Sequence, residues 1–517
     1  MAISRRKFLA NATALTASTL IGKRAFPAVT SSAQKILIRM DSEIGVVKPE
    51  FHGHFAEHLG SCVYGGLWVG KNSHIPNING YRKQAVEYLR DLGVPVLRWP
   101  GGCFADDYHW REGIGPAAQR SKRVNIHWGG YLEDNSFGLH EFIGLCRLLG
   151  AEPYLAGNVG SGSPKELRDW IEYCNYPKGS TLSDERAANG SPEPFRVRYW
   201  GVGNENWGCG GNMEPAEYAR LFRDFSVYVR EFGGTEPFRV ACGPSGDDTR
   251  WSRGLYDGLR GELPDGVSMH YYSGGADVAT KFTADHMNEQ LASYAKVEEA
   301  LLHQRAVLDS YQRGRDVGLI LDEWGVWDQI PEEDEKKYGK LWQQSTMRSA
   351  VAAGLGLNIF NRQADKLYMC NIAQIVNVLQ AILLTDGPEG EHCVRTTTYH
   401  AFSLFKAHRS KTAVKVETTD SSPLGLSLSA SKNAKELVIT CVNPRSDSDM
   451  QVECDVRGGS LKDGTAQILH DADLNAYNSF EQPDRVAPQK HSVKVDGGKV
   501  RIDLPRLSVV TAVVSIT

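Results

Sequence analysis

The chain lacks several patterns that mark common functional classes. It has no C-x-x-C pair, no H-E-x-x-H pair, no G-x-G-x-x-G loop and no EF-hand pattern. Zinc and thiol-redox motifs, zinc peptidases, phosphate-binding loops and EF-hand calcium sites are therefore not indicated. With 58 basic and 62 acidic residues, the chain also has no positive excess that would attract nucleic acid.

The first 33 residues have the composition of an export signal. Arg5, Arg6 and Lys7 precede a weakly apolar run from Phe8 to Gly22, and small residues follow. The sequence SRRKFL resembles the twin-arginine signal, and the apolar run is too short and too polar to span a membrane. A chance arginine pair on a disordered tail is the alternative. We expect a signal peptide over residues 1–33, a periplasmic or secreted protein, and no membrane attachment after cleavage.

The ten cysteines are scattered between positions 62 and 454. Twin-arginine substrates fold before export, in a reducing compartment where disulfides are rare. We therefore expect most of these cysteines to be buried thiols, and the sequence leaves open whether any of them pair.

Residues from about 50 to 400 alternate between short apolar runs and amphipathic stretches. Eight strands that alternate with helices favour an α/β fold, a (β/α)8 TIM barrel with insertions. The expected strands are Phe51–Glu57, Val96–Gly101, Glu152–Asn158, Arg196–Gly203, Phe238–Pro244, Gly266–Tyr272, Gly318–Glu323 and Lys366–Ala373. The expected helices are Tyr81–Leu92, Phe137–Leu149, Pro164–Tyr173, Glu214–Phe232, Thr283–Ser310 and Gln344–Asn361.

The helical pattern ends near residue 410. Short alternating runs such as ELVITCVNP and KVRIDLP follow, joined by turns, and predict a jelly-roll-like β-sandwich. KILIRMD, at residues 35–41, is a further strand that we expect to pair with this sandwich. The expected division is therefore a strand segment over 34–48, a catalytic barrel over 49–409 and a sandwich over 410–517.

Active sites of such barrels lie at the carboxyl ends of the strands. Carboxylates, amides and aromatic side chains gather where six of the expected strands end, a combination suited to sugar binding. These residues are Glu57, Arg98, Cys103, Asn204, Glu205, His270, Tyr272, Glu323, Trp327 and Gln374.

Two glutamates at one rim suit glycoside hydrolysis, which needs one protonated and one charged carboxyl group. Glu205 lies between two amides and close to Trp207, so desolvation and a nearby carboxylate could disfavour its charge. We assign it the acid/base role. Glu323 follows the apolar run GLIL and is assigned the nucleophile role. A single strand-end glutamate is more often a cap or an ion-pair partner, but two, each followed by tryptophan, are harder to explain in that way.

Other residues have competing explanations. His52, His54 and His58 could bind a metal, although their spacing matches no zinc motif. Strand alternation predicts that Asp322 points away from Glu323, as a structural hydrogen-bonding group.

The Asp106–Asp107 pair is expected in an exposed loop rather than in a calcium site. Cys103 as a thiol nucleophile is a weaker alternative, because no activating partner is evident. We expect neither a metal nor a cofactor.

Five motifs in order, FAEHLG, LRWPGGCFADDYHWREGIGP, YWGVGNENWGCGG, LDEWGVW and MCNIAQIVNVLQAI, resemble the α-L-arabinofuranosidases of glycoside hydrolase family 51. The resemblance spans residues 40 to 517. It implies a retaining exo-enzyme that removes arabinofuranosyl groups from an arabinose-containing glycan by double displacement. It also implies a homo-oligomer, such as the hexamers of many members.

The resemblance implies roles for single residues. Glu205 would be the acid/base and Glu323 the nucleophile. Asn204 would hold the sugar's 2-hydroxyl, while Glu57 and Gln374 would bind other hydroxyls. Tyr272, rather than Tyr271, would donate a hydrogen bond to the nucleophile. Arg98 would orient carboxylates, and Trp327 would form a wall of the pocket. His270 is a further expected substrate-binding residue.

One position departs from the commoner family pattern, since Cys103 stands where many members have asparagine. A hydroxyl contact would therefore differ there. A β-glycanase of the same clan, and a non-catalytic sugar-binding barrel, remain as alternative functions.

Overall fold

The computed structural model describes residues 33–517, except 312, 419–421 and 423. Residues 1–32 of the expected signal peptide, with its arginine pair, lie outside the described residues. Within them, no helix is long and apolar enough to cross a membrane.

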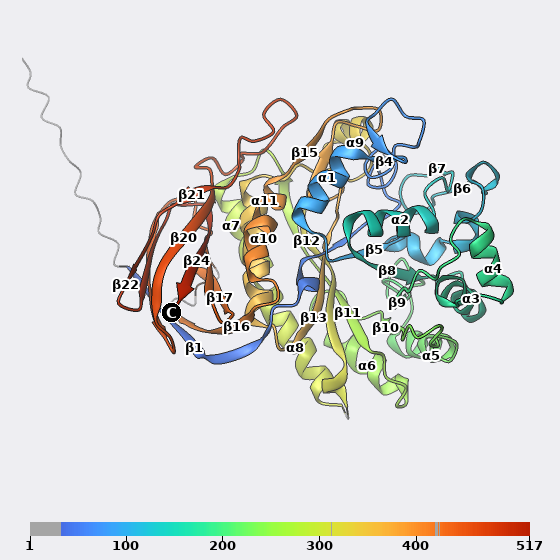
Figure 1. The fold of residues 1–517 in the computed structure, drawn as a ribbon, viewed down its shortest axis with the longest axis horizontal. Helices are drawn as coiled ribbons and strands as arrows, with labels where there is room; N and C mark the ends of the chain where they lie inside the picture. Colours follow the sequence, from blue (N-terminus) through green and yellow to red (C-terminus); the bar gives the residue numbers. More distant parts are fainter. Residues whose placement is uncertain (1–32, 312, 419–421, 423) are drawn as a thin grey trace, which may run out of the picture. The chain divides into compact units, whose positions relative to one another are not determined.

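Eight parallel strands close into a barrel, as the sequence predicts (Figure 1). Around the barrel they run in chain order and the last pairs with the first. Each expected strand is present, some with shifted ends: β2 Gly53–Phe55, β5 Val96–Trp99, β8 Glu152–Gly157, β9 Tyr199–Val202, β10 Phe238–Ala241, β11 Gly266–Val278, β12 Gly318–Gln329 and β13 Leu367–Ala373.

The expected helices are also present: α1 Lys83–Leu92, α2 Leu139–Leu149, α3 Pro164–Asn175, α5 Pro215–Ser226 and α10 Met347–Arg362. Thr283–Ser310, expected as one helix, breaks at Lys296 into α7 Ala284–Ala295 and α8 Val297–Asp309. The sequence analysis missed α4 Thr181–Ala188, α6 Thr249–Leu259, α9 Glu332–Tyr338 and α11 Thr397–Phe405. Local signals fix some boundaries: at α3, Ser163 accepts a hydrogen bond from the Glu166 amide and Pro164 occupies the first turn.

The strands after residue 410 form a ten-stranded sheet that also includes β1, Gln34–Val46. The others are β16 Thr412–Thr418, β17 Ser427–Lys432, β18 Glu436–Asn443, β19 Met450–Arg457, β20 Leu461–His470, β21 Gln489–His491, β22 Val493–Asp496, β23 Lys499–Leu504 and β24 Ser508–Ile516.

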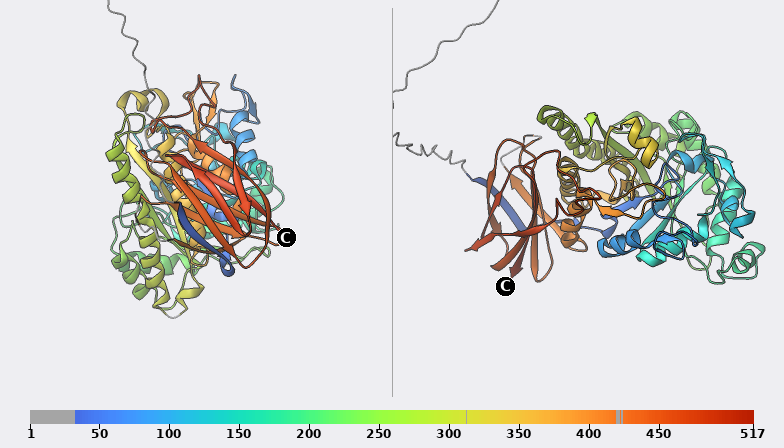
Figure 2. Two further views of the ribbon diagram at one scale, coloured as in Figure 1. Left: turned by 90° about the vertical axis from the view of Figure 1, so that its left-hand side faces the viewer. Right: turned by 90° about the horizontal axis from the view of Figure 1, so that it is seen from above.

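Within this sheet, β1 pairs antiparallel with β16 and parallel with β19, and Figure 2 shows it in blue among the orange and red strands. The sheet folds over on itself, since β22 at one end of its order contacts β20 near the other end. It encloses its own apolar core, which contains Ile38, Ile439 and Val514.

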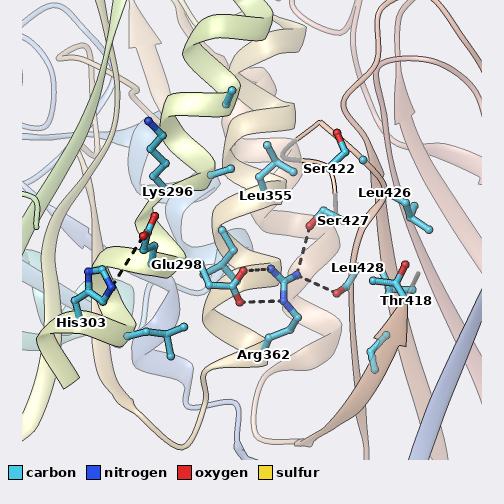
Figure 3. A pocket seen from close by; sticks show the side chains of 17 residues that line it. Lys296, Glu298, His303, Leu355, Arg362, Thr418, Ser422, Leu426, Ser427 and Leu428 are labelled. Atoms are coloured by element: carbon cyan, nitrogen blue, oxygen red, sulfur yellow. Dashed lines mark hydrogen bonds and ion pairs between the residues drawn. The ribbon is translucent and has the colours of Figure 1, made fainter. Parts of the chain in front are cut away.

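Helix α10 joins the barrel to this sheet. All of its residues except Arg362 are buried, as expected for a helix covered on opposite faces. Asn361 donates to the hydroxyl of Ser429 in β17, and that hydroxyl donates to Asn358. Beside this contact, α7, α8, α10 and β17 line a cavity of about 630 Å³ (Figure 3). There, Arg362 donates to Glu298 of α8 and to the backbone carbonyl of Leu428.

Candidate active site

The structure places the ten predicted site residues together at the carboxyl ends of the barrel strands. They form two connected groups. The first surrounds Arg98 and contains Asn204, Glu205, His270, Tyr272 and Glu323, and the second surrounds Glu57 and contains Gln374. Cys103 contacts Glu205 at the rim, and the half-buried Trp327 ring packs edge-on against Tyr272.

Arg98, in β5, lies at the bottom of the site. Its Nη1 donates to Oε1 of Glu323 over 2.7 Å, and its Nη2 donates to Oδ1 of Asn204 over 2.6 Å. Its Nε lies 3.3 Å from Oδ2 of Asp322. A buried guanidinium of this kind is stable only when carboxylates compensate its charge, so the ion pairs with Asp322 and Glu323 and the hydrogen bond to Asn204 hold the group in place.

Strand alternation predicted that Asp322 points away from Glu323, and this prediction was wrong. Along β12, Leu321 is opposite Met269 whereas Glu323 is opposite His270, so β12 has one extra residue at Asp322. This β-bulge interrupts the alternation, and both acidic side chains reach Arg98. Asp322 is nevertheless the structural hydrogen-bonding group expected, since it accepts from Tyr154 and Asn371.

Glu323 is held in its charged form. Burial alone would raise the pKa of its carboxyl group, but the nearby His270 and Arg98 and hydrogen bonds from Arg98 and Tyr272 lower it overall. The Tyr272 hydroxyl donates to Oε2 over 2.8 Å, whereas the Tyr271 hydroxyl donates to Ser293 in α7. The preference for Tyr272 over Tyr271 as the partner of Glu323 is therefore confirmed.

Glu205 faces Glu323 across His270. Nδ1 of His270 lies 2.8 Å from Oε1 of Glu205 and 3.6 Å from Oε2 of Glu323. Burial lowers the pKa of His270, but the two glutamates outweigh it, so the net shift is upward. A carboxylate oxygen of Glu205 and one of Glu323 lie within 4.8 Å of each other.

The backbone at Glu205 is strained. Its φ of 43° lies in the left-handed region that non-glycine residues rarely adopt, and Gly203 has a φ of 86°. A Cβ atom at Gly203 would lie 2.2 Å from Oδ1 of Asn206, so only glycine fits. This turn directs Glu205 from the end of β9 into the site.

Glu57 is the acceptor for the second group. It accepts from Nε1 of Trp128 over 2.9 Å, the Phe104 amide over 3.1 Å and Nε2 of Gln374 over 3.1 Å. Burial, followed by repulsion from Glu323, raises its pKa to about 7. The sequence analysis missed Trp128, whose only signal is a position between a histidine and two glycines in a loop.

The two glycines after Pro100 allow the loop to approach both carboxylates. A Cβ atom at Gly102 would lie 2.9 Å from Oε1 of Glu323, and one at Gly101 would lie 2.8 Å from Cγ of Glu57. Side chains at these positions would therefore displace the glutamates.

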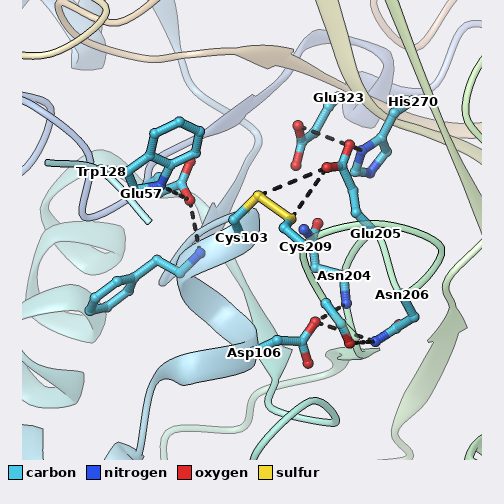
Figure 4. Close-up of a disulfide and its surroundings, with 12 residues drawn as sticks. Glu57, Cys103, Asp106, Trp128, Asn204, Glu205, Asn206, Cys209, His270 and Glu323 are labelled. Atoms are coloured by element: carbon cyan, nitrogen blue, oxygen red, sulfur yellow. Dashed lines mark hydrogen bonds and ion pairs between the residues drawn. A yellow bond between two sulfur atoms is a disulfide. The ribbon is translucent and has the colours of Figure 1, made fainter. Parts of the chain in front are cut away.

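Cys103 and Cys209 form a disulfide at the rim (Figure 4). Cys103 begins the 3-10 helix η2, Cys103–Asp107, and Cys209 follows β9. The sequence left this pairing open; a thiol nucleophile is excluded while the disulfide is intact. The other eight cysteines are buried thiols, in agreement with the expectation for most of them. The carboxylate of Glu205 lies 3.9 Å from Sγ of Cys103 and 3.5 Å from Sγ of Cys209.

The expectation that Asp106 lies in an exposed loop was wrong. Asp106 is 5% exposed and accepts from the backbone amides of Val159, Gly160 and Asn204. Burial raises its pKa to about 7, although these hydrogen bonds act in the opposite direction. It fixes the backbone of Asn204, so it belongs to the support of the site.

The three early histidines do not form a metal site. His58 lies between Glu133 and Trp99, whereas His52 accepts from Arg409. Burial and Arg409 lower the pKa of His54 to about 3. Two groups in the described part of the chain have metal-ligand spacing, and neither contains these histidines: Cys103–Glu205–Cys209 and Glu205–His270–Glu323.

Two buried amide atoms at the site have no hydrogen-bond partner among the described residues. They are Nδ2 of Asn204 and Oε1 of Gln374. Such unpaired atoms are costly in a buried site unless a bound molecule satisfies them. Trp128, Tyr131 and residues of α9 also line a neighbouring cavity of about 780 Å³.

Comparison with known proteins gives consistent matches along the chain. The profile of the Alpha-L-arabinofuranosidase 1 domain matches residues 88–289, and that of the Alpha-L-arabinofuranosidase C-terminal domain matches residues 322–508. The chain is 43% identical to an intracellular exo-α-L-arabinofuranosidase of Bacteroides ovatus, over 93% of this chain and 96% of that protein.

Two solved structures have the same fold over nearly their whole length. The GH51 arabinofuranosidase of Xanthomonas axonopodis pv. citri superposes with a TM-score of 0.89 at 38% identity, covering 93% of this chain and 99% of that one. The α-L-arabinofuranosidase of Thermotoga maritima, in complex with arabinose, superposes with a TM-score of 0.83 at 30% identity, covering 93% and 100%.

Proposed function

The chain belongs to the α-L-arabinofuranosidases of glycoside hydrolase family 51, and from this premise we propose that it is a retaining, exo-acting enzyme. It releases terminal α-L-arabinofuranosyl residues from an arabinose-containing glycan by double displacement. The spacing of at most 4.8 Å between oxygens of Glu205 and Glu323 supports retention. Retaining glycosidases hold their carboxyl groups about 5–5.5 Å apart, whereas inverting enzymes need roughly 6.5–9.5 Å to admit water.

Glu323 is the nucleophile in this proposal. Its lowered pKa keeps it charged, and Arg98 and Tyr272 hold one oxygen each. Its carboxylate attacks the anomeric carbon, the bond to the leaving oxygen breaks, and an arabinosyl ester forms. Water then attacks the same carbon and releases Glu323.

Glu205 is the acid/base. It gives its proton to the leaving oxygen in the first step and takes a proton from water in the second. His270, 2.8 Å away, fixes the orientation of its carboxyl group. The strained turn at Glu205 holds that group at the rim, where the leaving group departs.

Asn204 and Gln374 bind the sugar with the two buried atoms that lack partners. Nδ2 of Asn204 donates to the 2-hydroxyl, while Oε1 of Gln374 accepts from another hydroxyl. Glu57 has lone pairs for a further hydroxyl. Trp327 forms one wall, and Cys103, as half of a disulfide, presents sulfur where asparagine would present an amide.

The stereochemistry of the first product tests the mechanism. Proton NMR of a nitrophenyl α-L-arabinofuranoside digest should show the α-anomer first, before mutarotation. Initial β-anomer would contradict the retaining assignment.

Single variants test the two glutamates. Glu323→Ala should abolish turnover, and unchanged turnover would refute its role. Glu205→Ala should lose more activity on poor leaving groups than on good ones and should be partly rescued by azide; equal losses would count against the acid role.

Product analysis distinguishes the exo-enzyme from a β-glycanase or a sugar-binding protein. Arabinoxylan should release free arabinose, and β-glucan should remain uncut. Release of internal fragments alone would favour the glycanase, and binding without release would favour the non-catalytic alternative.

The proposal extends to the organisation and location of the chain. Residues 1–33 form a twin-arginine signal, 34–48 a strand segment, 49–409 the barrel and 410–517 the sandwich. The Bacteroides ovatus relative is named intracellular, so export is tested directly. Wild type should fractionate to the periplasm or medium, and a variant with Arg5→Lys and Arg6→Lys should remain inside; wild type found only in the cytoplasm would overturn export. Light scattering should give a homo-oligomer, such as a hexamer.

A further inference from the structure

Two sulfur atoms and a carboxylate oxygen lie together at the rim of the site. Ligand atoms of Cys103, Glu205 and Cys209 lie within 4.8 Å of one another. The Cα atoms of the two cysteines are 5.5 Å apart, and neither cysteine is buried. Because both cysteines are partly accessible to solvent, a soluble reductant can reach the disulfide.

Reduction converts the two sulfurs into metal ligands. A phosphine takes one oxygen from water and supplies two electrons, so that one S–S bond breaks, two S–H bonds form and phosphine oxide is released. Each thiol then loses a proton when it binds a metal ion. Tetrahedral zinc, with bonds of about 2.3 Å to sulfur, needs sulfurs roughly 3.8 Å apart, a separation that two side chains on these backbones can reach.

From this geometry we infer that the reduced protein binds a thiophilic dication, Zn²⁺ or Cd²⁺, through Cys103, Cys209 and Glu205. The ion takes the Glu205 carboxylate away from its reaction, so the metal-bound reduced form is inactive. This loss of activity rests on the acid/base role proposed for Glu205, whereas metal binding itself does not.

The contacts around Glu205 favour this site. Nδ1 of His270 lies against Oε1, which leaves Oε2 turned toward the sulfurs. A hydrogen bond from a neighbouring side chain, such as the one between His270 and Glu205, fixes the orientation of a carboxylate that binds a metal.

The alternative group, Glu205, His270 and Glu323, is less suitable. Arg98 and Tyr272 already donate to the two oxygens of Glu323, and the Arg98 charge would repel a cation. The soft sulfurs also prefer the ions named here.

Cadmium titration is the direct test. Protein treated with a phosphine and then freed of it under argon should show one equivalent of cadmium–thiolate absorption in the near ultraviolet. Oxidised protein should show none. Equal absorption in the two forms would overturn the site.

Variants locate the ion. Cys103→Ser and Cys209→Ser should each weaken cadmium binding by roughly 100-fold or more, and Glu205→Gln by roughly 10-fold. Cys393→Ser, which removes a buried thiol of β15 (Cys393–Arg395), should not change it. Absorption that persists when both rim cysteines are replaced would contradict the assignment.

Activity on a nitrophenyl arabinofuranoside tests the consequence. Reduced, metal-free protein should be active, cadmium should abolish that activity at the concentration that saturates the absorption, and a chelator should restore it. Saturated absorption with full activity would overturn the inactivation. If the oxidised protein does not cleave the substrate at all, the proposed function fails, while the absorption still tests the site.

Discussion

The hydroxyl of Tyr272 and the carboxylate of Glu323 meet across a 2.8 Å hydrogen bond between neighbouring strands β11 and β12. Arg98 holds the other oxygen of the same carboxylate. The carboxylate proposed as nucleophile is thus fixed from two sides, and each contact can be removed separately.

Tyr272→Phe removes one contact and keeps the ring. Because a hydrogen bond to a charged group contributes about 1.5–3 kcal/mol, kcat/KM should fall roughly 10- to 100-fold. Tyr271→Phe removes a hydroxyl that donates to the Ser293 carbonyl and not to Glu323; it is the matched control and should keep nearly full activity. Steady-state kinetics on a nitrophenyl arabinofuranoside measures both; equal losses would show that Tyr272 acts only through folding.

Arg98→Met leaves Asp322 and Glu323 without their shared buried cation. Removal of one member of such a group costs about 3–5 kcal/mol of unfolding free energy. The exposed pair of Arg111 and Glu185 provides the control, since Arg111→Met should cost about 0–1 kcal/mol. Urea unfolding followed by tryptophan fluorescence compares them, and similar costs would contradict the role of Arg98.

Glu57 gives stability a dependence on pH. Its pKa is raised from 4.5 to about 7 in the folded protein, so between these values the folded state binds the proton more tightly. The contribution of Glu57 to the free energy of unfolding is fully present below pH 4.5 and is lost as pH rises through 7, a change on the order of 3 kcal/mol. Glu57→Gln should remove this dependence, because an amide does not titrate in this pH range. The amide of Gln374 can turn to keep a hydrogen bond with the new side chain. Unfolding midpoints of wild type and Glu57→Gln at pH 5.5 and 8 measure this dependence. Equal shifts in the two proteins would refute Glu57 as its source.

His408, which lies between the barrel and the C-terminal sheet, makes stability depend on pH in the opposite direction. Its ring lies 2.8 Å from the hydroxyls of Ser431 and Thr440, and burial followed by Lys411 lowers its pKa to about 3. Because the unfolded histidine takes up a proton first, stability falls by about 1.4 kcal/mol per pH unit below 6.5.

His408→Gln should be less stable than wild type at pH 7. Because only the wild type loses stability through this histidine as pH falls, the difference in unfolding free energy between the two proteins should narrow. Ser431→Ala removes one partner but keeps the ring, so its dependence on acid should match that of wild type. Thermal unfolding between pH 5 and 7 provides the measurement. A constant difference for His408→Gln would exclude the histidine as the source.

The sequence predicted the barrel because its strand and helix periods differ so clearly. The GLIL run before Asp322 and the amphipathic stretch over α5 need no tertiary information. The gathering of site residues follows from one rule, that parallel strands end at the same rim. The structure brings Glu205 and Glu323 together as that rule requires.

Features that depend on contacts between distant segments could not be predicted. The bulge at Asp322 arises from pairing with β11, and two adjacent acidic residues look alike whichever way they point. The Cys103–Cys209 disulfide joins loops after β5 and β9, which are separated in the barrel by β8. Only the short distance of Cys209 from Glu205 along the chain could have indicated that it lies at the rim.

The place of β1 in the C-terminal sheet sets the order in which the chain can fold during synthesis. β1 ends at Val46, whereas its neighbours β16 and β19 begin at Thr412 and Met450. The ribosome therefore releases β1 before the barrel, whereas its partner strands β16 and β19 are released after the barrel. Until then the apolar face of β1, with Ile36, Ile38 and Met40, has no partner strands to pack against. The sheet can therefore be completed only after the sandwich strands have been translated.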